Sequence, residues 1–245
     1  MADWLFDLGN SRLKFAPMHD DGNVGDVFAV AHDGERFASL ALEALPASIT
    51  HAHVASVAAA PLRESLLATL HARGAAVALA ATERRCAGVE VAYEEPGQLG
   101  VDRFLALLAA HARGGDRLVV GVGTALTIDL VDRDGSHHGG RIAPSPTLMR
   151  ETLHARASQL PSTGGDYREF AGDTADALAS GCIGAALALV ERSLREAGRR
   201  LGHPAGLLLH GGGAGELAPH FPHAVQAPGL VLEGLACWAR ERRDR

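Results

Sequence analysis

Residues 7–14, DLGNSRLK, combine the side chains that a phosphate-binding turn needs. Lys14 is the only lysine among the 23 lysine and arginine residues of the chain. A glycine turn exposes successive backbone N–H groups to phosphate oxygens, and a flexible ammonium reaches outer phosphates more easily than the planar fork of arginine. Asp7 offers oxygen ligands of the kind that Mg²⁺ prefers, directly or through water. The alternative is a plain hairpin whose Asp and Asn form the turn.

A second glycine turn, at Gly123 and Thr124, begins the other half of the chain in a matching way. Asp129 follows inside the apolar run 126–131, LTIDLV. A carboxylate on an apolar strand is costly unless it is paired, hydrogen-bonded or bound to a cation. We therefore expect Asp129 to form a cation site or to brace the turn.

A third glycine turn, HGGGA at 210–214, follows a short apolar run and allows the backbone to approach a flat base or a ribose. It is not a GxGxxG fingerprint, because Glu216 stands where the last glycine is required. No GxxxxGK[ST] sequence occurs either. The expected phosphate chemistry therefore belongs to neither the dinucleotide-binding class nor the P-loop class.

Asp102 lies in GVDR, where a glycine loop leads into an apolar helix that begins near Val101. The helix dipole favours an ionised acid in the first turn, and such a carboxylate can accept a proton from a substrate hydroxyl. Arg103 beside it is suited to hold a substrate carboxylate. The alternative is that Asp102 only caps the helix.

The composition is that of an ordinary globular protein. The 245 residues are 47% apolar and carry a net charge of −6, with no basic stripe, which argues against nucleic acid as the main partner. Three separated cysteines without CxxC spacing favour a reducing cytoplasm. The acidic amino terminus is unlike a signal peptide, and no run reaches the roughly 18 apolar residues of a membrane span. The 13 histidines show no metal-site spacing.

Both halves of the chain open with a strand, a glycine turn and a second strand. The pattern predicts strands over 4–8, 13–17, 27–31, 53–57, 117–122, 126–131, 138–142 and 206–209, with a further apolar run at 75–80. It predicts helices over 35–45, 62–73, 101–112, 147–157, 174–198 and 230–240. The pair Gly114–Gly115 is the best boundary, so we expect two similar α/β lobes, 1–114 and 115–245, with a cleft between them.

Taken together, the motifs DLGNSRLK, GVDR, GTALTID, GGRIAPS (139–145) and HGGGA resemble, in this order and over almost the whole chain, the type III pantothenate kinases of bacteria. These belong to the acetate and sugar kinase, Hsp70 and actin superfamily. The resemblance implies an α/β fold of duplicated ribonuclease H-like, actin-like ATPase lobes with a nucleotide cleft between the lobes. It also implies ATP-dependent phosphorylation of pantothenate to 4′-phosphopantothenate by a cytoplasmic homodimer that needs Mg²⁺ and a monovalent cation, K⁺ or NH₄⁺.

Each site residue is carried over by its position in a matching motif. The resemblance implies that Asp102 is the catalytic base and that Asp129 binds the monovalent cation. The implied ATP-binding residues are Asp7, Leu8, Gly9, Asn10, Ser11, Arg12, Leu13, Lys14, Gly123, Thr124, Asp132, Gly211 and Gly212. The implied pantothenate-binding residues are Tyr93, Gly100, Val101, Asp102, Arg103 and Thr174. Thr174 is expected to act across a dimer interface formed by helices of the second lobe.

Three positions depart from the family pattern: Ser11 replaces a threonine, Ser145 replaces a glycine, and His210 replaces a threonine. Two other functions stay open. In the first, the chain is a kinase that phosphorylates another small hydroxylated metabolite, because one fold hosts many kinases. In the second, the chain is a non-enzymatic nucleotide-binding regulator, an accessory factor in transcription. The intact Asp102–Arg103 pair and the lack of basic patterning argue against the regulator.

Overall fold

The computed structural model describes residues 3–38 and 41–243, without the Ala41 side chain, and divides the chain into two compact units. The first unit comprises residues 1–114, 134–137 and 229–245, and the second comprises 115–133 and 138–228. The first division lies at Gly114–Gly115, where the sequence places its boundary. The end of the chain differs from the expectation, because 229–245 groups with the first unit and not with the second.

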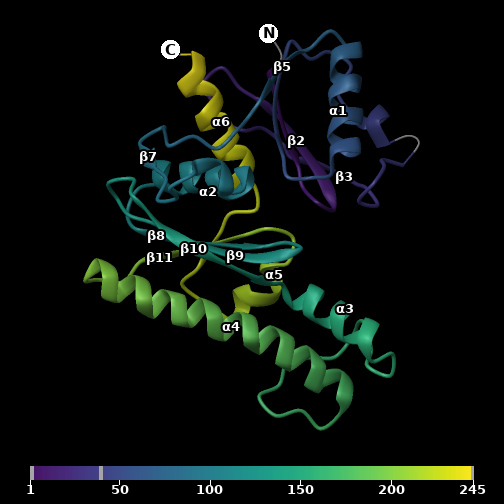
Figure 1. Ribbon diagram of the computed structural model, residues 1–245, viewed down its shortest axis with the longest axis vertical. Helices are drawn as coiled ribbons and strands as arrows, with labels where there is room; N and C mark the ends of the chain where they lie inside the picture. The colour runs from purple at the N-terminus through teal and green to yellow at the C-terminus, as the bar shows by residue number, and fades with distance from the viewer. Residues whose placement is uncertain (1–2, 39–40, 244–245) are drawn as a thin grey trace. The chain divides into compact units, whose positions relative to one another are not determined.

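The first unit is built on a five-stranded sheet (Figure 1). Its strands are β1 (Asp3–Leu8), β2 (Arg12–Met18), β3 (Phe28–Ala31), β4 (His51–Ser56) and β5 (Ala76–Leu79). Their order in the sheet is β3-β2-β1-β4-β5. β2 is antiparallel to β1 and β3, whereas β4 is parallel to β1 and β5. A tight hairpin followed by parallel strands with helical crossovers is typical of α/β folds.

The second unit repeats this arrangement. Its strands are β8 (Arg117–Val122), β9 (Ala125–Val131), β10 (His137–Pro144), β11 (Gly206–His210) and β12 (Val225–Gln226). They lie in the order β10-β9-β8-β11-β12, which is the order of the first sheet position by position. β9 is again antiparallel to β8, and β11 is parallel to β8 and β12. The duplicated α/β architecture predicted from the sequence is therefore present.

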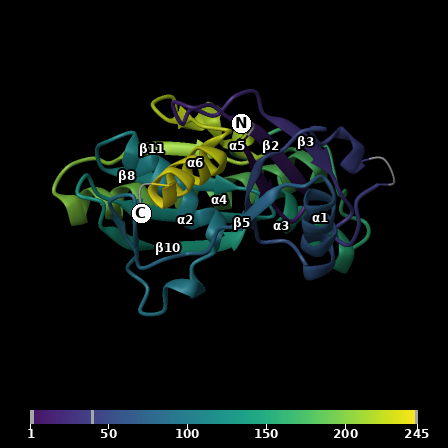
Figure 2. The same ribbon diagram turned by 90° about the horizontal axis from the view of Figure 1, so that it is seen from above.

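Helices cover the sheet of the first unit on both faces. The helices are α1 (Ala60–Ala72), α2 (Val101–Ala112) and α6 (Leu230–Arg243). α1 buries its leucines against one face, in a core with Phe6, Leu8 and Val54. α6 lies beside α2 in both views and contacts β1 and β4 on the other face (Figures 1 and 2). This packing is the physical reason why the end of the chain joins the first unit.

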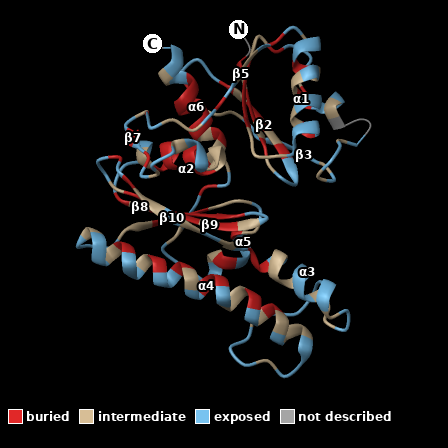
Figure 3. Cartoon of the chain, viewed as in Figure 1, coloured by how far each residue is buried: buried red, intermediate tan, exposed pale blue. Residues whose placement is uncertain are grey.

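The long helix α4 (Thr174–Leu201) runs along one face of the second sheet, and α3 (Pro146–Arg156) packs against it. Its buried stripe, which includes Ala186 and Val190, meets the even-numbered residues of β8 and β9 (Figure 3). Within the described chain α4 alone is long and apolar enough to cross a membrane by length and composition. It contains no unbroken run of 18 apolar residues, and the core helix of a soluble protein passes the same test.

One expected helix is wrong, because 35–45 holds only the 3₁₀ helix Ala41–Ala44; residues 39–40 lie outside the description. A segment of about this length is a marginal helix former by itself, so tertiary packing decides whether it becomes a helix. The pattern also missed several short elements, which have too few residues for a periodic signal. These are β6 (Arg85–Cys86), β7 (Val89–Glu90), α5 (Ala214–Leu217), and the 3₁₀ helices Pro96–Gln98 and Ala218–His220.

The α2–α6 contact depends on a missing side chain. A Cβ placed on Gly234 would collide with the backbone carbonyl of Leu105. We expect Gly234→Ala to lower the free energy of unfolding by about 1–3 kcal/mol, because backbone has to move. Gly184→Ala in α4 is the control, since its nearest neighbour, Tyr167, would lie at 3.8 Å. Urea unfolding measures the free energy of unfolding of both variants, and equal values for Gly234→Ala and Gly184→Ala would contradict the prediction.

His53 of β4 is a buried titratable group beneath α6. It is 9% exposed, and its ring centroid lies 6.3 Å from that of Trp238. Neither ring nitrogen has a hydrogen-bond partner among the described residues, and the Asp3 carboxylate is 3.8 Å from Nε2. Burial, and then the charge of His51, lower the pKa of His53 to about 4. His53 is therefore neutral in the folded state at pH 7.

The unfolded chain thus binds more protons than the folded chain between pH about 6.5 and pH about 4. The contribution of neutral His53 to stability is present above pH 6.5 and is lost as the pH falls through this window. We expect the free energy of unfolding to fall by about 1–3 kcal/mol across this window, and we expect His53→Leu to reduce this pH dependence. Thermal unfolding at several pH values measures the pH dependence, with His71→Gln on the exposed side of α1 as control. An unchanged pH slope in His53→Leu would contradict this.

Candidate active site

The first candidate phosphate turn joins β1 to β2. Its ends are closed by the Gly9 N–H, which donates to the Arg12 carbonyl at 3.0 Å, so that Asn10 and Ser11 form the exposed tip. His32, next to the end of β3, braces the turn from the side. Its backbone N–H donates to the Ser11 carbonyl, and its Nε2 lies 3.0 Å from the Gly9 carbonyl. The tip is therefore held in shape and open to a ligand.

Asp7 and Lys14 face each other across this hairpin, because they are directly paired in the register of β1 and β2. Both side chains are partly buried. Burial, and then the negative charge of Asp102, raise the pKa of Asp7 to about 7, while the Lys14 ammonium acts in the opposite direction. The structure thus assembles Asp7, Lys14 and Asp102 at one end of the first sheet, although Asp102 is far from the others in sequence.

Asp102 occupies the second position of α2. The preceding Gly100 is the N-cap residue and supplies no side-chain hydrogen bond. The Asp102 carboxylate accepts a 2.8 Å hydrogen bond from the Arg103 N–H, which orients it. A Cβ on Gly100 would lie 2.7 Å from that carboxylate oxygen, so glycine leaves room for it. Asp102 therefore stabilises the helix start, and its charge also acts on Asp7.

Arg103 and Tyr93 form a second group in the same unit. Arg103 is 6% exposed, and its Nη1 donates to the Tyr93 hydroxyl at 3.3 Å. The Tyr93 ring stacks on His137, with centroids 5.9 Å apart and 19° between the planes. Arg84 holds the loop by donating to the carbonyls of Val91 and Tyr93. His137 and Arg84 had no distinctive sequence signal, because their partners lie at other points of the chain.

The second and third glycine turns pack on each other within the second unit. The Gly123 N–H donates to the Ala125 carbonyl at 2.9 Å, which leaves Thr124 at the exposed tip. The Gly213 N–H donates to the Val122 carbonyl at 2.9 Å. Gly211 has φ +91°, and a Cβ there would collide with that carbonyl. Both the φ angle and the close carbonyl require glycine at position 211. The hydrogen bond from Gly213 to Val122 brings the two predicted nucleotide turns together.

The structure does not bring Asp129 and Asp132 to the tip of the second turn. Asp129 is 3% exposed and pairs with Val119 in the register, three pairs away from the last pair of the hairpin, Val122 with Leu126. Asp132 follows the far end of β9, on the order of 20 Å from the tip at about 3.4 Å per residue. Asp132 is therefore separated along β9 from the tip of the turn, and its contact with ATP stays a prediction.

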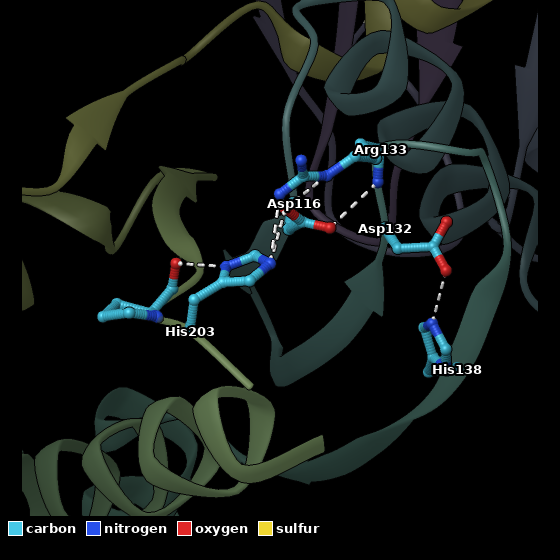
Figure 4. Close-up of polar contacts among 6 residues, drawn as sticks. Asp116, Asp132, Arg133, His138 and His203 are labelled. Carbon is cyan, nitrogen blue, oxygen red and sulfur yellow. Dashed lines mark hydrogen bonds and ion pairs between the residues drawn. The ribbon is translucent and has the colours of Figure 1, made fainter. Parts of the chain in front are cut away.

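Figure 4 shows that Asp132 is instead hydrogen-bonded to His138. Arg200 extends this pair to a chain of three residues. Its carboxylate lies 2.7 Å from His138 Nε2, and Arg200 Nε donates to His138 Nδ1 at 2.9 Å. Because Nδ1 accepts, the proton of neutral His138 is on Nε2. A neighbouring cluster of Asp116, Arg133 and His203 closes the same end of the β8–β9 pair. Both groups have a structural role in joining strand ends.

Thr174, the remaining predicted substrate residue, is exposed at the first position of α4. The helix is capped by Asp173, whose carboxylate accepts a 3.0 Å hydrogen bond from the Asp176 N–H. Thr174 is therefore a surface residue of the second unit whose side chain is not needed for the cap.

A family model described as "Type III pantothenate kinase" matches residues 4–196 of this chain. Curated proteins of that name match nearly the full length. The protein of Stenotrophomonas maltophilia (strain K279a) is 60% identical over 239 residues, and that of Xanthomonas campestris pv. campestris (strain B100) is 60% identical over 241 residues. Both alignments cover 98% of each chain. The chain belongs to the type III pantothenate kinase family.

Solved structures agree on the fold. A putative Baf family transcriptional activator from Campylobacter jejuni has a TM-score of 0.66 at 22% identity, covering 99% of this chain and 100% of that one. A putative 2-dehydro-3-deoxygalactonokinase from Sinorhizobium meliloti has a TM-score of 0.56 at 17% identity, covering 97% and 98%. At these identities the likeness concerns the fold alone, and it agrees with the predicted α/β fold of two similar lobes.

Proposed function

We propose that this chain is an ATP-dependent kinase that transfers the γ-phosphoryl group of ATP to the hydroxyl of pantothenate, the first step of coenzyme A biosynthesis. Membership in the type III pantothenate kinase family supports the reaction class. The observation that carries the proposal is the assembly of Asp7, Lys14 and Asp102 beside an exposed glycine turn. A plain hairpin or a simple helix cap would not need two carboxylates and an ammonium together.

In this proposal the substrate hydroxyl is oriented by Asp102, which accepts its proton as the oxygen attacks the γ-phosphorus in line. The backbone N–H groups of the first turn and Lys14 neutralise the charge of the phosphoryl group. Phosphoryl transfer depends mainly on such positioning and electrostatic stabilisation. Arg103, held by Tyr93, is the group that would bind the pantothenate carboxylate.

The proposed ATP-binding residues lie in the three glycine turns. They are 7–14, Gly123, Thr124, Gly211 and Gly212. The exposed tips of the first two turns, and the glycine turn at 211–213 packed against Val122, support this assignment. Gly100, Val101 and Thr174 complete the proposed pantothenate site. Asp132 is left out, because its carboxylate is engaged with His138 at the far end of β9.

The surroundings of Asp7 fit a divalent cation. Burial and the charge of Asp102 disfavour the ionised form of the Asp7 carboxylate. A bound cation would favour that ionised form and so offset both effects. Mg²⁺ typically takes one or two carboxylates together with waters and substrate phosphates. No group of three metal-ligating side chains occurs in the described part of the chain. When bound, Mg²⁺ would supply positive charge to the phosphate oxygens.

We also propose a homodimer, formed by helices of the second unit, in the cytoplasm. An apolar groove of about 370 Å³ lies between α3 and α4, lined in part by Met149, Leu153 and Leu178. Phe170, in the loop between these helices, is 98% exposed. Two unpartnered apolar features on one unit suit a contact between copies. Analytical ultracentrifugation of the wild type and of Phe170→Ser tests the dimer.

A coupled assay of ADP release with and without pantothenate tests the proposed reaction. Pantothenate is expected to stimulate ADP release, with 4′-phosphopantothenate as product by mass spectrometry. A panel of other hydroxy acids and sugars tests the alternative acceptors, and stimulation by one of these alone would overturn pantothenate as the substrate. ATP binding without any phosphorylated product would favour the regulator.

A further inference from the structure

The segment 91–99 brings Tyr93 to the side of Arg103 and has little secondary structure of its own. It follows the short hairpin β6–β7 and contains only the 3₁₀ helix Pro96–Gln98 before α2 begins. The Tyr93 ring stacks on His137, and the Tyr93 hydroxyl accepts a 3.3 Å hydrogen bond from Arg103 Nη1. Because Arg103 is proposed to bind the carboxylate of the acceptor, the path of this segment also shapes that site.

A single side chain, that of Arg84, gathers three carbonyls of this segment. Its guanidinium donates to the carbonyl of Val91 at 3.0 Å and to those of Tyr93 and Glu94. All three carbonyls lie within residues 91–94. In an extended strand the carbonyls of neighbouring residues point in opposite directions, so only a curved main chain brings them to one planar fork. The guanidinium therefore selects one path of the chain beside Tyr93.

The two ends of the segment are held by other hydrogen bonds. The Val91 N–H donates to the Arg84 carbonyl at 3.0 Å, which closes the β6–β7 hairpin. At the other end, the Thr82 hydroxyl donates to the carbonyl of Leu99 at 2.8 Å. Leu99 is buried, whereas Tyr93 in the middle of the segment is only partly buried. The Arg84 side chain thus acts where the segment has the least packing.

The next residue, Arg85, offers a matched comparison. Its guanidinium forms an ion pair with Glu90 at 2.9 Å across the same hairpin, and the two side chains are 74% and 52% exposed. Exposed ion pairs of this kind contribute little to stability. The two neighbouring arginines therefore differ in what they hold. Arg84 holds the main chain beside Tyr93, and Arg85 holds a carboxylate on the surface.

We propose that Arg84 is a positioning residue for the acceptor, which fixes the main chain at 91–94 and thereby sets the Tyr93 hydroxyl against Arg103. The inference rests on the proposed function for the identity of the acceptor, an organic acid whose carboxylate pairs with Arg103. A segment that is already fixed avoids the entropy cost of ordering it when the substrate binds. Arg84 thus acts on the affinity for the acceptor and leaves the proton transfer to Asp102 unchanged.

Hydrogen exchange of the ligand-free protein tests the structural half of the proposal. In Arg84→Met, which keeps a long apolar stem without donors, amide exchange within 91–99 is expected to become about tenfold faster or more, because the segment opens more often. Arg85→Met is the control and should leave the exchange of that segment as in the wild type. The exchange of β1 should be unchanged in both variants, as expected of a folded unit. Equal exchange of 91–99 in the two variants would overturn the proposal.

Steady-state kinetics tests the functional half. Arg84→Met is expected to raise the KM for pantothenate roughly 5- to 20-fold, with kcat and the KM for ATP within about twofold of the wild type. A general loss of folded protein would instead lower kcat and leave both KM values unchanged. Arg84→Lys keeps the charge without the planar fork and is expected to recover only part of the loss. An unchanged KM for pantothenate in Arg84→Met, or full recovery by lysine, would overturn the proposal.

Failure of the proposed function would give a different result. If the wild type phosphorylates another hydroxy acid and not pantothenate, the proposed reaction fails, and the KM for that acid replaces the KM for pantothenate in the same comparison. If the wild type phosphorylates no acceptor, the functional half fails together with the proposed reaction. Hydrogen exchange needs no substrate, so in each case it decides separately whether Arg84 fixes the segment.

Discussion

Asp102→Asn is expected to lower kcat by about 10² to 10⁴, the usual effect of removing a general base. The amide of asparagine keeps the size of the side chain and an oxygen that can accept the Arg103 N–H, so α2 should still form. It cannot take the proton from the substrate hydroxyl. A coupled kinase assay on the purified variant measures the loss, which should appear in kcat far more than in the KM for ATP.

The same variant has a second, distinguishing effect. The charge of Asp102 contributes to the raised pKa of Asp7, so its removal should lower that pKa toward the ordinary value. Loss of the like-charge neighbour should stabilise the folded protein, and loss of the negative charge at the start of α2 should destabilise it, so the thermal stability should stay close to that of the wild type. Glu94→Gln, an exposed acid near the same loop, is the control and should keep full activity. Wild-type turnover in a folded Asp102→Asn protein would contradict the assignment.

Lys14→Met is expected to raise the KM for ATP by about tenfold or more and to lower kcat by about 10². The change removes the ammonium opposite Asp7 and leaves a side chain of similar length. Phosphate oxygens lose a partner, and the pKa of Asp7 should rise further because Lys14 opposes the raising effects. Steady-state kinetics over a range of ATP and Mg²⁺ concentrations measures both effects. Arg192→Met, an exposed cation on α4, is the control.

Lys14→Arg separates charge from shape at the same position. Arginine keeps the positive charge, but its planar fork requires more width than a compact ammonium. We expect intermediate kinetics, with most of the loss in the KM for ATP. Activity equal to the wild type would show that the single lysine of the chain reflects chance substitution, and that only charge matters at position 14.

The sequence by itself determined the local features. The order of strands, glycine turns and long helices followed from periodicity and turn residues, because these depend on neighbours within a few positions. Asp7, Lys14 and Asp102 were singled out by residue type alone.

Only the tertiary structure decided which distant residues meet. Asp102 reaches Asp7 because α2 packs on the same sheet, and α6 joins the first unit because Gly234 allows its backbone to approach α2. His210 lies over Gly121 because β11 pairs with β8 in one particular register. Such contacts depend on strand register and helix packing between segments far apart in the chain. No local pattern of residues encodes those distances, so the sequence did not show that Asp132 meets His138 beyond the end of β9.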